Sequence, residues 1–184
     1  MAELPFPSPH LADDVVVLRP WRETDLAAQL EAFSDQFFQD FSDWAPLTEA
    51  DARRHLVEQE QARRRGEQVE FALVEPNDHD VLLGGGSLNN VDLKQGRAAV
   101  GYWLAAHARG RGVATHAVRL IARWAFEHLG IARLELTCGT DNHASKRVAQ
   151  RCGFTREGVL RSHMPFKGSR RDTVVFSLLP RELA

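Results

Sequence analysis

The sequence is poor in several reactive residue types, and each scarcity excludes a class of function. Two cysteines, Cys138 and Cys152, are too few for a disulfide framework, and no His-Glu-x-x-His pattern or Cys/His cluster occurs, so we expect no metal. Tyrosine occurs once, at Tyr102. No apolar run approaches the roughly 20 residues of a membrane span. The first ten residues lack the basic and then apolar pattern of a signal peptide, so we expect a cytoplasmic protein.

Neither sign of charge dominates the chain. The 23 lysine and arginine residues are balanced by 25 aspartate and glutamate residues, which gives a formal net charge of −2. A dedicated nucleic-acid-binding protein usually carries a strong basic excess, so we expect neither nucleic acid nor a membrane as partner. The length of 184 residues suits one domain spanning 1–184, with a core at about 14–180 and a lead at 1–13.

Hydrophobic periodicity predicts a mixed sheet with helices on both of its faces. Apolar or alternating runs bounded by turn residues predict strands at 15–19, 69–73, 81–88, 97–104, 134–138, 155–162 and 173–179. Periodic or capped stretches predict helices at 25–33, 48–66, 113–129 and 144–151. This order of elements is typical of a mixed α/β fold.

The stretch from Arg109 to Ala114 joins a predicted strand to the strongly amphipathic helix at 113–129. Its two glycines, Gly110 and Gly112, give the backbone amides room to turn outward. Because the N–H groups of a helix start are unpaired and lie at the positive end of the helix dipole, they bind phosphate well. We therefore predict an anion site here. The three glycines at 84–86 have no Gly-Lys-Ser/Thr after them and indicate a bulge or a close backbone approach within a strand.

The pattern Arg109-x-x-Gly112-x-Ala114 resembles the acyl-CoA pyrophosphate signature of the GNAT superfamily of N-acetyltransferases. Further stretches resemble its branch of ribosomal-protein alanine N-acetyltransferases, the RimJ/RimL type: Val16 to Asp25, Asp43-Trp44, Thr140 to Ser145, Cys152 to Gly158 and Arg171 to Leu179. The resemblance covers about residues 14–180. It implies an α+β (mixed α/β) GNAT fold, with a mostly antiparallel mixed sheet of about seven strands and about four flanking helices.

The resemblance also implies an activity. It is the transfer of acetyl from acetyl-CoA, as cosubstrate, to a primary amine by direct attack, in a monomer or a homodimer. The acceptor would be a protein N-terminal α-amine or a small-molecule amine. Deprotonating an α-amine of pKa near ~8 at pH 7 costs about 1.4 kcal/mol, whereas a lysine amine near ~10.4 costs roughly 4.6 kcal/mol. The alternatives are another donor, such as succinyl-CoA, and a non-catalytic CoA-binding sensor domain.

Individual residues receive roles from the same resemblance. The strand at Tyr102–Leu104 would splay from its neighbour and admit the pantetheine arm, and a backbone N–H near Leu104 would polarise the thioester carbonyl. Ser145 would stand near the leaving sulfur, and Glu157 would be the base, acting through water. The expected CoA-binding residues are Trp103, Leu104, Arg109, Gly110, Arg111, Gly112, Val113, Ala114, Thr115, Asn142 and Ser145. The expected acceptor-binding residues are Phe41, Trp44 and Tyr102.

Several of these residues also suit an ordinary structural role. Asn142 is a good helix N-cap, Ser145 a first-turn helix residue and Glu157 a solvated strand end. The aromatic stretch from Phe37 to Trp44 suits core filling as well as a substrate wall. The sequence also departs from the family, because Ala99-Val100 replaces a common glutamate and Phe176 stands where a catalytic tyrosine is usual. Weak base machinery favours an amine that loses its proton easily.

Overall fold

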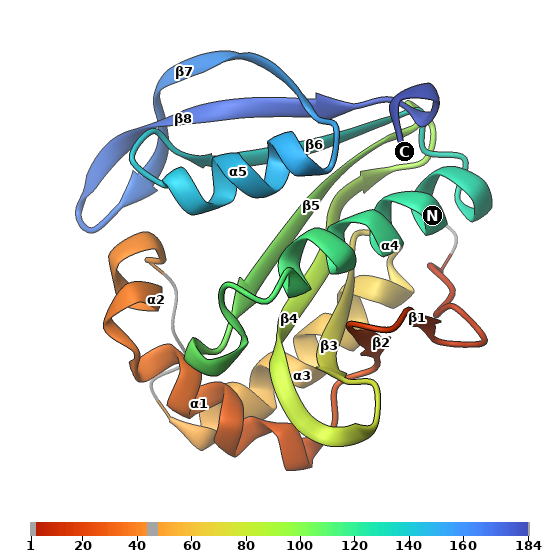
Figure 1. The fold of residues 1–184 in the computed structure, drawn as a ribbon, viewed down its shortest axis with the longest axis vertical. Helices are drawn as coiled ribbons and strands as arrows, with labels where there is room; N and C mark the ends of the chain where they lie inside the picture. The colour runs from red at the N-terminus through yellow and green to blue at the C-terminus, as the bar shows by residue number, and fades with distance from the viewer. Residues whose placement is uncertain (1–2, 44–47, 184) are drawn as a thin grey trace.

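The computed structural model describes residues 3–43 and 48–183, and its strands form one eight-stranded sheet (Figure 1). The strand order is β1-β2-β3-β4-β5-β6-β8-β7. All neighbouring strands are antiparallel except β5 and β6, which are parallel. The strands are β1 (Leu11–Ala12), β2 (Val17–Arg19), β3 (Val69–Glu75), β4 (Asp78–Asp92), β5 (Arg97–Leu104), β6 (Arg133–Gly139), β7 (Thr155–Phe166) and β8 (Ser169–Leu178). The predicted fold class is confirmed.

Helices cover both faces of this sheet. In Figure 1, α4 and α5 lie in front of the sheet and α3 lies behind it. The α-helices are α1 (Leu26–Ser34), α2 (Gln36–Phe41), α3 (Glu49–Arg64), α4 (Val113–His128) and α5 (His143–Arg151), and short 3-10 helices occupy Glu23–Asp25, Ala106–Ala108 and Pro180–Glu182. The described part of the chain thus has one strand and one helix more than expected. Within it, no helix has both the length and the apolar character needed to cross a membrane.

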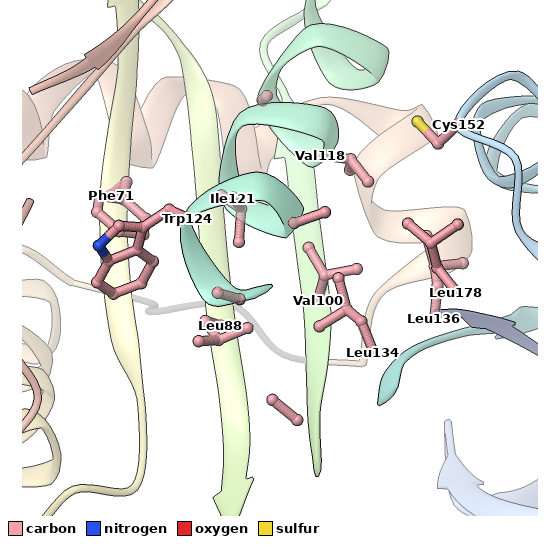
Figure 2. Packing of buried hydrophobic residues seen from close by; sticks show 14 of the residues in the cluster. Phe71, Leu88, Val100, Val118, Ile121, Trp124, Leu134, Leu136, Cys152 and Leu178 are labelled. Carbon is pink, nitrogen blue, oxygen red and sulfur yellow. The ribbon is translucent and has the colours of Figure 1, made fainter. Parts of the chain in front are cut away.

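The main core lies between α4 and the sheet. Figure 2 shows Val118, Ile121 and Trp124 of α4 directed toward buried side chains of the strands. Trp124 meets Phe71 of β3 edge to face, with ring centroids 5.8 Å apart. Burying each such side chain contributes roughly 1.5–3 kcal/mol. This packing explains the strong amphipathic pattern of α4 and holds the N-terminal end of the helix beside β5.

The glycines at 84–86 allow a close approach within the sheet, as predicted. Gly85 pairs with Trp103 across β4 and β5. A Cβ at Gly85 would collide with the indole nitrogen of Trp103, and a Cβ at Gly84 would collide with the Trp103 carbonyl oxygen. Because Gly84 and Gly85 have no side chains, the indole of Trp103 can lie directly on β4. There it packs against Trp21 and Phe33, with ring centroids 6.0 and 4.7 Å away.

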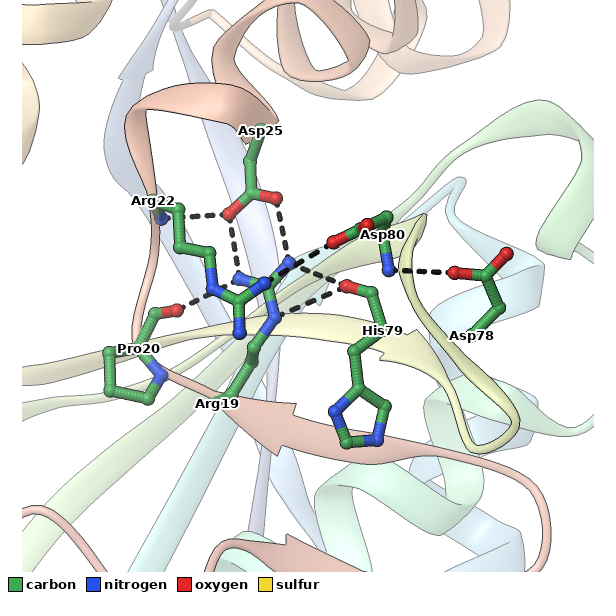
Figure 3. Close-up of polar contacts among 7 residues, drawn as sticks. All are labelled: Arg19, Pro20, Arg22, Asp25, Asp78, His79 and Asp80. Carbon is green, nitrogen blue, oxygen red and sulfur yellow. Dashed lines mark hydrogen bonds and ion pairs between the residues drawn. The ribbon is translucent and has the colours of Figure 1, made fainter.

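A buried ion pair fastens the start of α1 to the sheet (Figure 3). Arg19 of β2 is 1% exposed and Asp25 is 4% exposed, and two hydrogen bonds of 2.7 Å join them. The guanidinium of Arg19 also donates to the carbonyl oxygens of Pro20 and of His79, the second residue of β4. The stretch from Val16 to Asp25 therefore has a structural role, because the opposite charges of Arg19 and Asp25 neutralise one another in the interior.

Candidate active site

The sheet opens between β5 and β6. These strands are paired only from Arg97–Arg133 to Ala99–Glu135. Beyond that point β5 stays with β4 and β6 stays with β8, so the two strands diverge, as Figure 1 shows. The expected splay at Tyr102–Leu104 is present. A strand edge without a partner leaves backbone N–H and C=O groups available to a ligand that lies along it.

A cavity of about 710 Å³ fills this opening. Its size is within the range of small-molecule sites. Four walls line it, formed by β5, by β6 with α5, by the start of α4 and by α2: Phe37, Phe38, Phe41, Ser42, Val100, Gly101, Tyr102, Trp103, Leu104, Arg109, Gly110, Gly112, Val113, Ala114, Thr115, Leu136, Thr137, Cys138, Gly139, Asn142, Ala144, Ser145, Arg147, Val148 and Arg151. We call it the donor cavity. The structure thus brings together the predicted CoA-binding residues except Arg111.

Backbone amides at the start of α4 form one end of the donor cavity. Gly110 and Gly112 have φ values of +76° and +85°, in the left-handed region that favours glycine. Gly112 is the N-cap of the helix, and its carbonyl accepts from the N–H groups of Thr115 and His116. Among the described residues, the N–H groups from Arg111 to Ala114 donate to no acceptor. Unpaired amides at the positive end of a helix dipole suit a phosphate.

The two arginines of this stretch are committed to carboxylates. Arg109 donates to Asp35 at 2.5 Å and to the Leu104 carbonyl at 3.2 Å, and its guanidinium lies 4.6 Å from the centroid of the Phe37 ring. The hydrogen bond from Arg109 holds the pKa of Asp35 below its usual range. Arg111 pairs with Glu75 at 2.6 Å. The anion site is therefore made by backbone amides, and Arg109 ties it to the aromatic residues of α2.

The inner wall of the donor cavity carries two hydroxyl groups. Asn142 caps α5 by accepting from the N–H of Ser145 at 2.9 Å, which is the structural role expected of it. The Tyr102 hydroxyl donates to Ser145 Oγ at 3.2 Å. Burial raises the pKa of Tyr102 to about 12 and also raises the pKa of the Cys138 thiol beside Ser145. The Tyr102 phenol and the Cys138 thiol are therefore both protonated near neutral pH.

The other predicted site residues lie in different surroundings. Glu157 is exposed on β7, where it accepts from Ser177 at 2.5 Å and pairs with Arg133 at 3.0 Å. The Ser177 hydroxyl and then Arg133 lower the pKa of Glu157. Glu157 does not line the donor cavity, and Trp44 lies outside the described residues. Phe41 lines the cavity, while Phe38 also stacks on Phe33 at 4.3 Å, so the aromatic stretch serves both core and wall.

Sequence reasoning missed a second, smaller cavity on the α3 side of the sheet. It measures about 330 Å³ and is lined by His55, Glu70, Gly85, Gly86, Ser87, Tyr102 and Trp103. The only sequence signal is a glutamate within the apolar run of β3. The wall supplied by β6 and by Arg147 and Arg151 of α5 was missed as well, although the three- and four-residue spacing along α5 places these side chains on one face.

Unpaired helix-start amides at one end of a long gap between strands suit a ligand with a phosphate at one end and a reactive group at the other. This is the form of an acyl-CoA, and it defines the class as acyl-CoA-dependent transferases. A family model described as acetyltransferase (GNAT) domain matches residues 16–155. The chain therefore belongs to the GNAT family of acetyltransferases, as the sequence resemblance predicted.

Individual relatives agree with this family. YdaF of Bacillus subtilis (strain 168), provisionally named a ribosomal N-acetyltransferase, is 38% identical over 101 residues, which is 55% of either chain. Thus the match spans about half the length of that relative. The uncharacterized N-acetyltransferase p20 of Bacillus licheniformis is 27% identical over 92% of this chain and 95% of its own length. The structure of Mycobacterium smegmatis RimJ in complex with CoA-disulfide superposes with a TM-score of 0.82 at 25% identity, covering 91% of this chain and 83% of that one.

Proposed function

We propose that residues 1–184 act as one GNAT domain that transfers acetyl from acetyl-CoA to a primary amine by direct attack. The observation that carries the proposal is the donor cavity, in which the unpaired amides from Gly112 to Ala114 open onto the gap between β5 and β6. The complex of RimJ with CoA-disulfide supports CoA as the ligand class for this cavity. The pyrophosphate would bind the helix-start amides, and the pantetheine arm would lie along the free edge of β5.

The chain's own groups suit the chemistry at the far end of the cavity. A backbone N–H near Leu104 would stabilise the negative charge that develops on the thioester oxygen. The neutral amine nitrogen forms a bond to the carbonyl carbon, and the carbon–sulfur bond breaks. Ser145 would pass its hydroxyl proton to the leaving thiolate and take up in return the proton that the attacking nitrogen loses as the amide forms, with its Oγ held by the Tyr102 hydroxyl. The products are an N-acetyl amine and the CoA thiol, and the ammonium form of the acceptor releases one proton.

We propose an α-amine, such as a polypeptide N-terminus, as the acceptor. The provisional name of YdaF, ribosomal N-acetyltransferase, supports a polypeptide as the acceptor. The free-energy argument supports its α-amine, because an α-amine is deprotonated at about 3 kcal/mol less cost than a lysine side chain at pH 7. Glu157 does not line the donor cavity, because Ser177 and Arg133 hold its carboxylate on β7. We therefore propose it as a base only through an intervening water.

Two measurements test this function. Isothermal titration with acetyl-CoA, CoA and ATP should show that both CoA forms bind more tightly than ATP. Mass spectrometry after incubation with acetyl-CoA and an amine panel should show an acetylated product, with N-terminal peptides ahead of polyamines and aminoglycosides. Equal affinity for ATP and CoA would contradict the donor assignment, and absence of product from every amine would contradict the enzymatic one.

A further inference from the structure

The second cavity lies across β5 from the donor cavity. Side chains alternate between the faces of a strand, so Tyr102 points to α5, where it reaches Ser145, and Trp103 points to the opposite face, where it reaches Phe33. Both residues line both cavities. A group on the α3 side can therefore approach the same stretch of β5 that the thioester would occupy from the α4 side.

Glu70 gives the second cavity a carboxylate that no arginine or lysine of the described residues neutralises. It accepts from Gln59 at 2.6 Å and from Gln68 at 2.9 Å, so both of its oxygens are held in place. Among the described residues, no arginine or lysine pairs with Glu70 or lines the cavity. Other glutamates of the chain differ in this respect, since Glu60 and Glu67 are bound by arginines.

His55 stands beside this carboxylate. Its Nε2 lies 3.7 Å from Glu70 Oε2, and its Nδ1 lies 4.0 Å from Glu58 Oε2. The side chains of His55 and Glu70 are 22% and 23% exposed, so the pair is accessible from solvent but mostly enclosed. Such a partly desolvated carboxylate binds a cation more strongly than a carboxylate on the open surface does.

We propose that the second cavity is the acceptor subsite, in which the Glu70 carboxylate, with His55 beside it, binds the ammonium group of the acceptor. The inference rests on the proposed function. Ser87 and the two glycines that line the floor are small, and a volume of about 330 Å³ admits a primary amine with a short substituent. We call this cavity the acceptor cavity.

Glu70→Gln is the variant that tests this assignment, because it removes the charge and keeps the shape. Steady-state release of CoA thiol, with the acceptor varied, should show an acceptor KM raised about tenfold to a hundredfold. The affinity for CoA should stay within about twofold of the wild type. Glu67→Gln is the matched control, since it removes a nearby, half-exposed carboxylate that is paired with Arg65, and its acceptor KM should not change.

Two further measurements separate the possible failures. His55→Gln should raise the acceptor KM about threefold and provides a second variant if Glu70→Gln unfolds. An unchanged acceptor KM in both variants, with wild-type turnover, overturns the subsite and leaves the proposed function intact. If the wild type turns over no amine, the CoA-saturated protein is titrated with spermidine and with an alanine-initiated tripeptide. This titration shows whether Glu70 is needed for amine binding. Binding lost in Glu70→Gln supports the subsite, and equal or absent binding in both proteins overturns it.

Discussion

The donor cavity and the acceptor cavity lie on opposite sides of β5 and are built in different ways. The anion site of the donor cavity uses backbone amides from one short stretch, Arg111 to Ala114, at a single helix start. The acceptor cavity uses side chains from α3, β3 and β4, among them His55, Glu70 and Ser87. The first depends on local conformation, and the second depends on the register of the sheet. Substitutions should therefore affect the two cavities separately, except where a support is shared.

The largest effect is expected where the two cavities share a support. Asp25→Ala leaves the buried guanidinium of Arg19 without its counter-charge and should lower the free energy of unfolding by about 3–5 kcal/mol. Because α1 carries Phe33 against Trp103, both cavities should weaken together. Urea unfolding measures the first effect and titration with CoA the second.

Asp80→Ala is the control for this change. Asp80 pairs with Arg22, but their side chains are 86% and 49% exposed, and such pairs contribute about 0–1 kcal/mol. If both alanine variants were equally stable, the buried pair of Arg19 and Asp25 would not be a support of the two cavities.

Ser145→Ala should separate catalysis from binding. Loss of the proposed proton donor should lower kcat roughly a hundredfold or more. Neither CoA affinity nor the acceptor KM should change by a comparable factor, because the helix-start amides and Glu70 are untouched. Rapid-mixing or steady-state assays at saturating concentrations of both substrates measure kcat. Wild-type turnover in this variant would remove Ser145 from the leaving-group role.

Gly112→Ala should weaken the donor cavity alone. A Cβ at a left-handed φ of +85° costs roughly 1–2 kcal/mol, and relief of that strain would turn the helix-start amides away from the phosphate. We expect CoA affinity to fall about 5- to 30-fold without a change in acceptor KM. Isothermal titration is the measurement.

Gly130→Ala provides a matched control at the other end of α4. Gly130 also has a left-handed φ, +68°, and a Cβ there would meet no heavy atom within 4 Å. The loss of stability should be similar to that of Gly112→Ala, but CoA affinity should be unchanged. Equal loss of CoA affinity in both variants would mean that helix stability, not the anion site, is responsible.

The same distinction explains what could be predicted from the sequence. The anion site follows from a contiguous pattern, and the caps by Thr48 and Asn142 follow from side chains that bond within three residues. The acceptor cavity requires Glu70 to face Ser87 across β3 and β4, a register that no local pattern specifies. The two strands of the C-terminal hairpin extend beyond their predicted bounds, to Phe166 and Ser169. The sequence does not predict this length, because β7 is exposed at most positions and lacks hydrophobic alternation. β1 has only two residues and so no periodicity to detect.

The smallest effect is expected at Tyr102, where the separation of the two cavities can be tested most finely. Tyr102→Phe removes the hydroxyl that holds Ser145 and keeps the ring that lines both cavities. A neutral hydrogen bond contributes about 0.5–1.5 kcal/mol, so kcat should fall about two- to tenfold. CoA affinity and acceptor KM should not change. A change in both binding constants would show that the hydroxyl couples the cavities instead of orienting Ser145.

The pH dependence of the same variant distinguishes orientation from acid–base catalysis by the phenol. Burial raises the pKa of Tyr102 from 10.0 to about 12, so the hydroxyl keeps its proton below about pH 10 and the kcat profiles of wild type and variant should be parallel there. Since the raised pKa favours the protonated folded state, its contribution to stability is complete below pH 10 and is lost as the pH rises toward 12. Because Tyr102 is the only tyrosine, phenolate absorbance reports this single titration directly. A midpoint near 10 would place the phenol in water and contradict the buried hydrogen bond to Ser145.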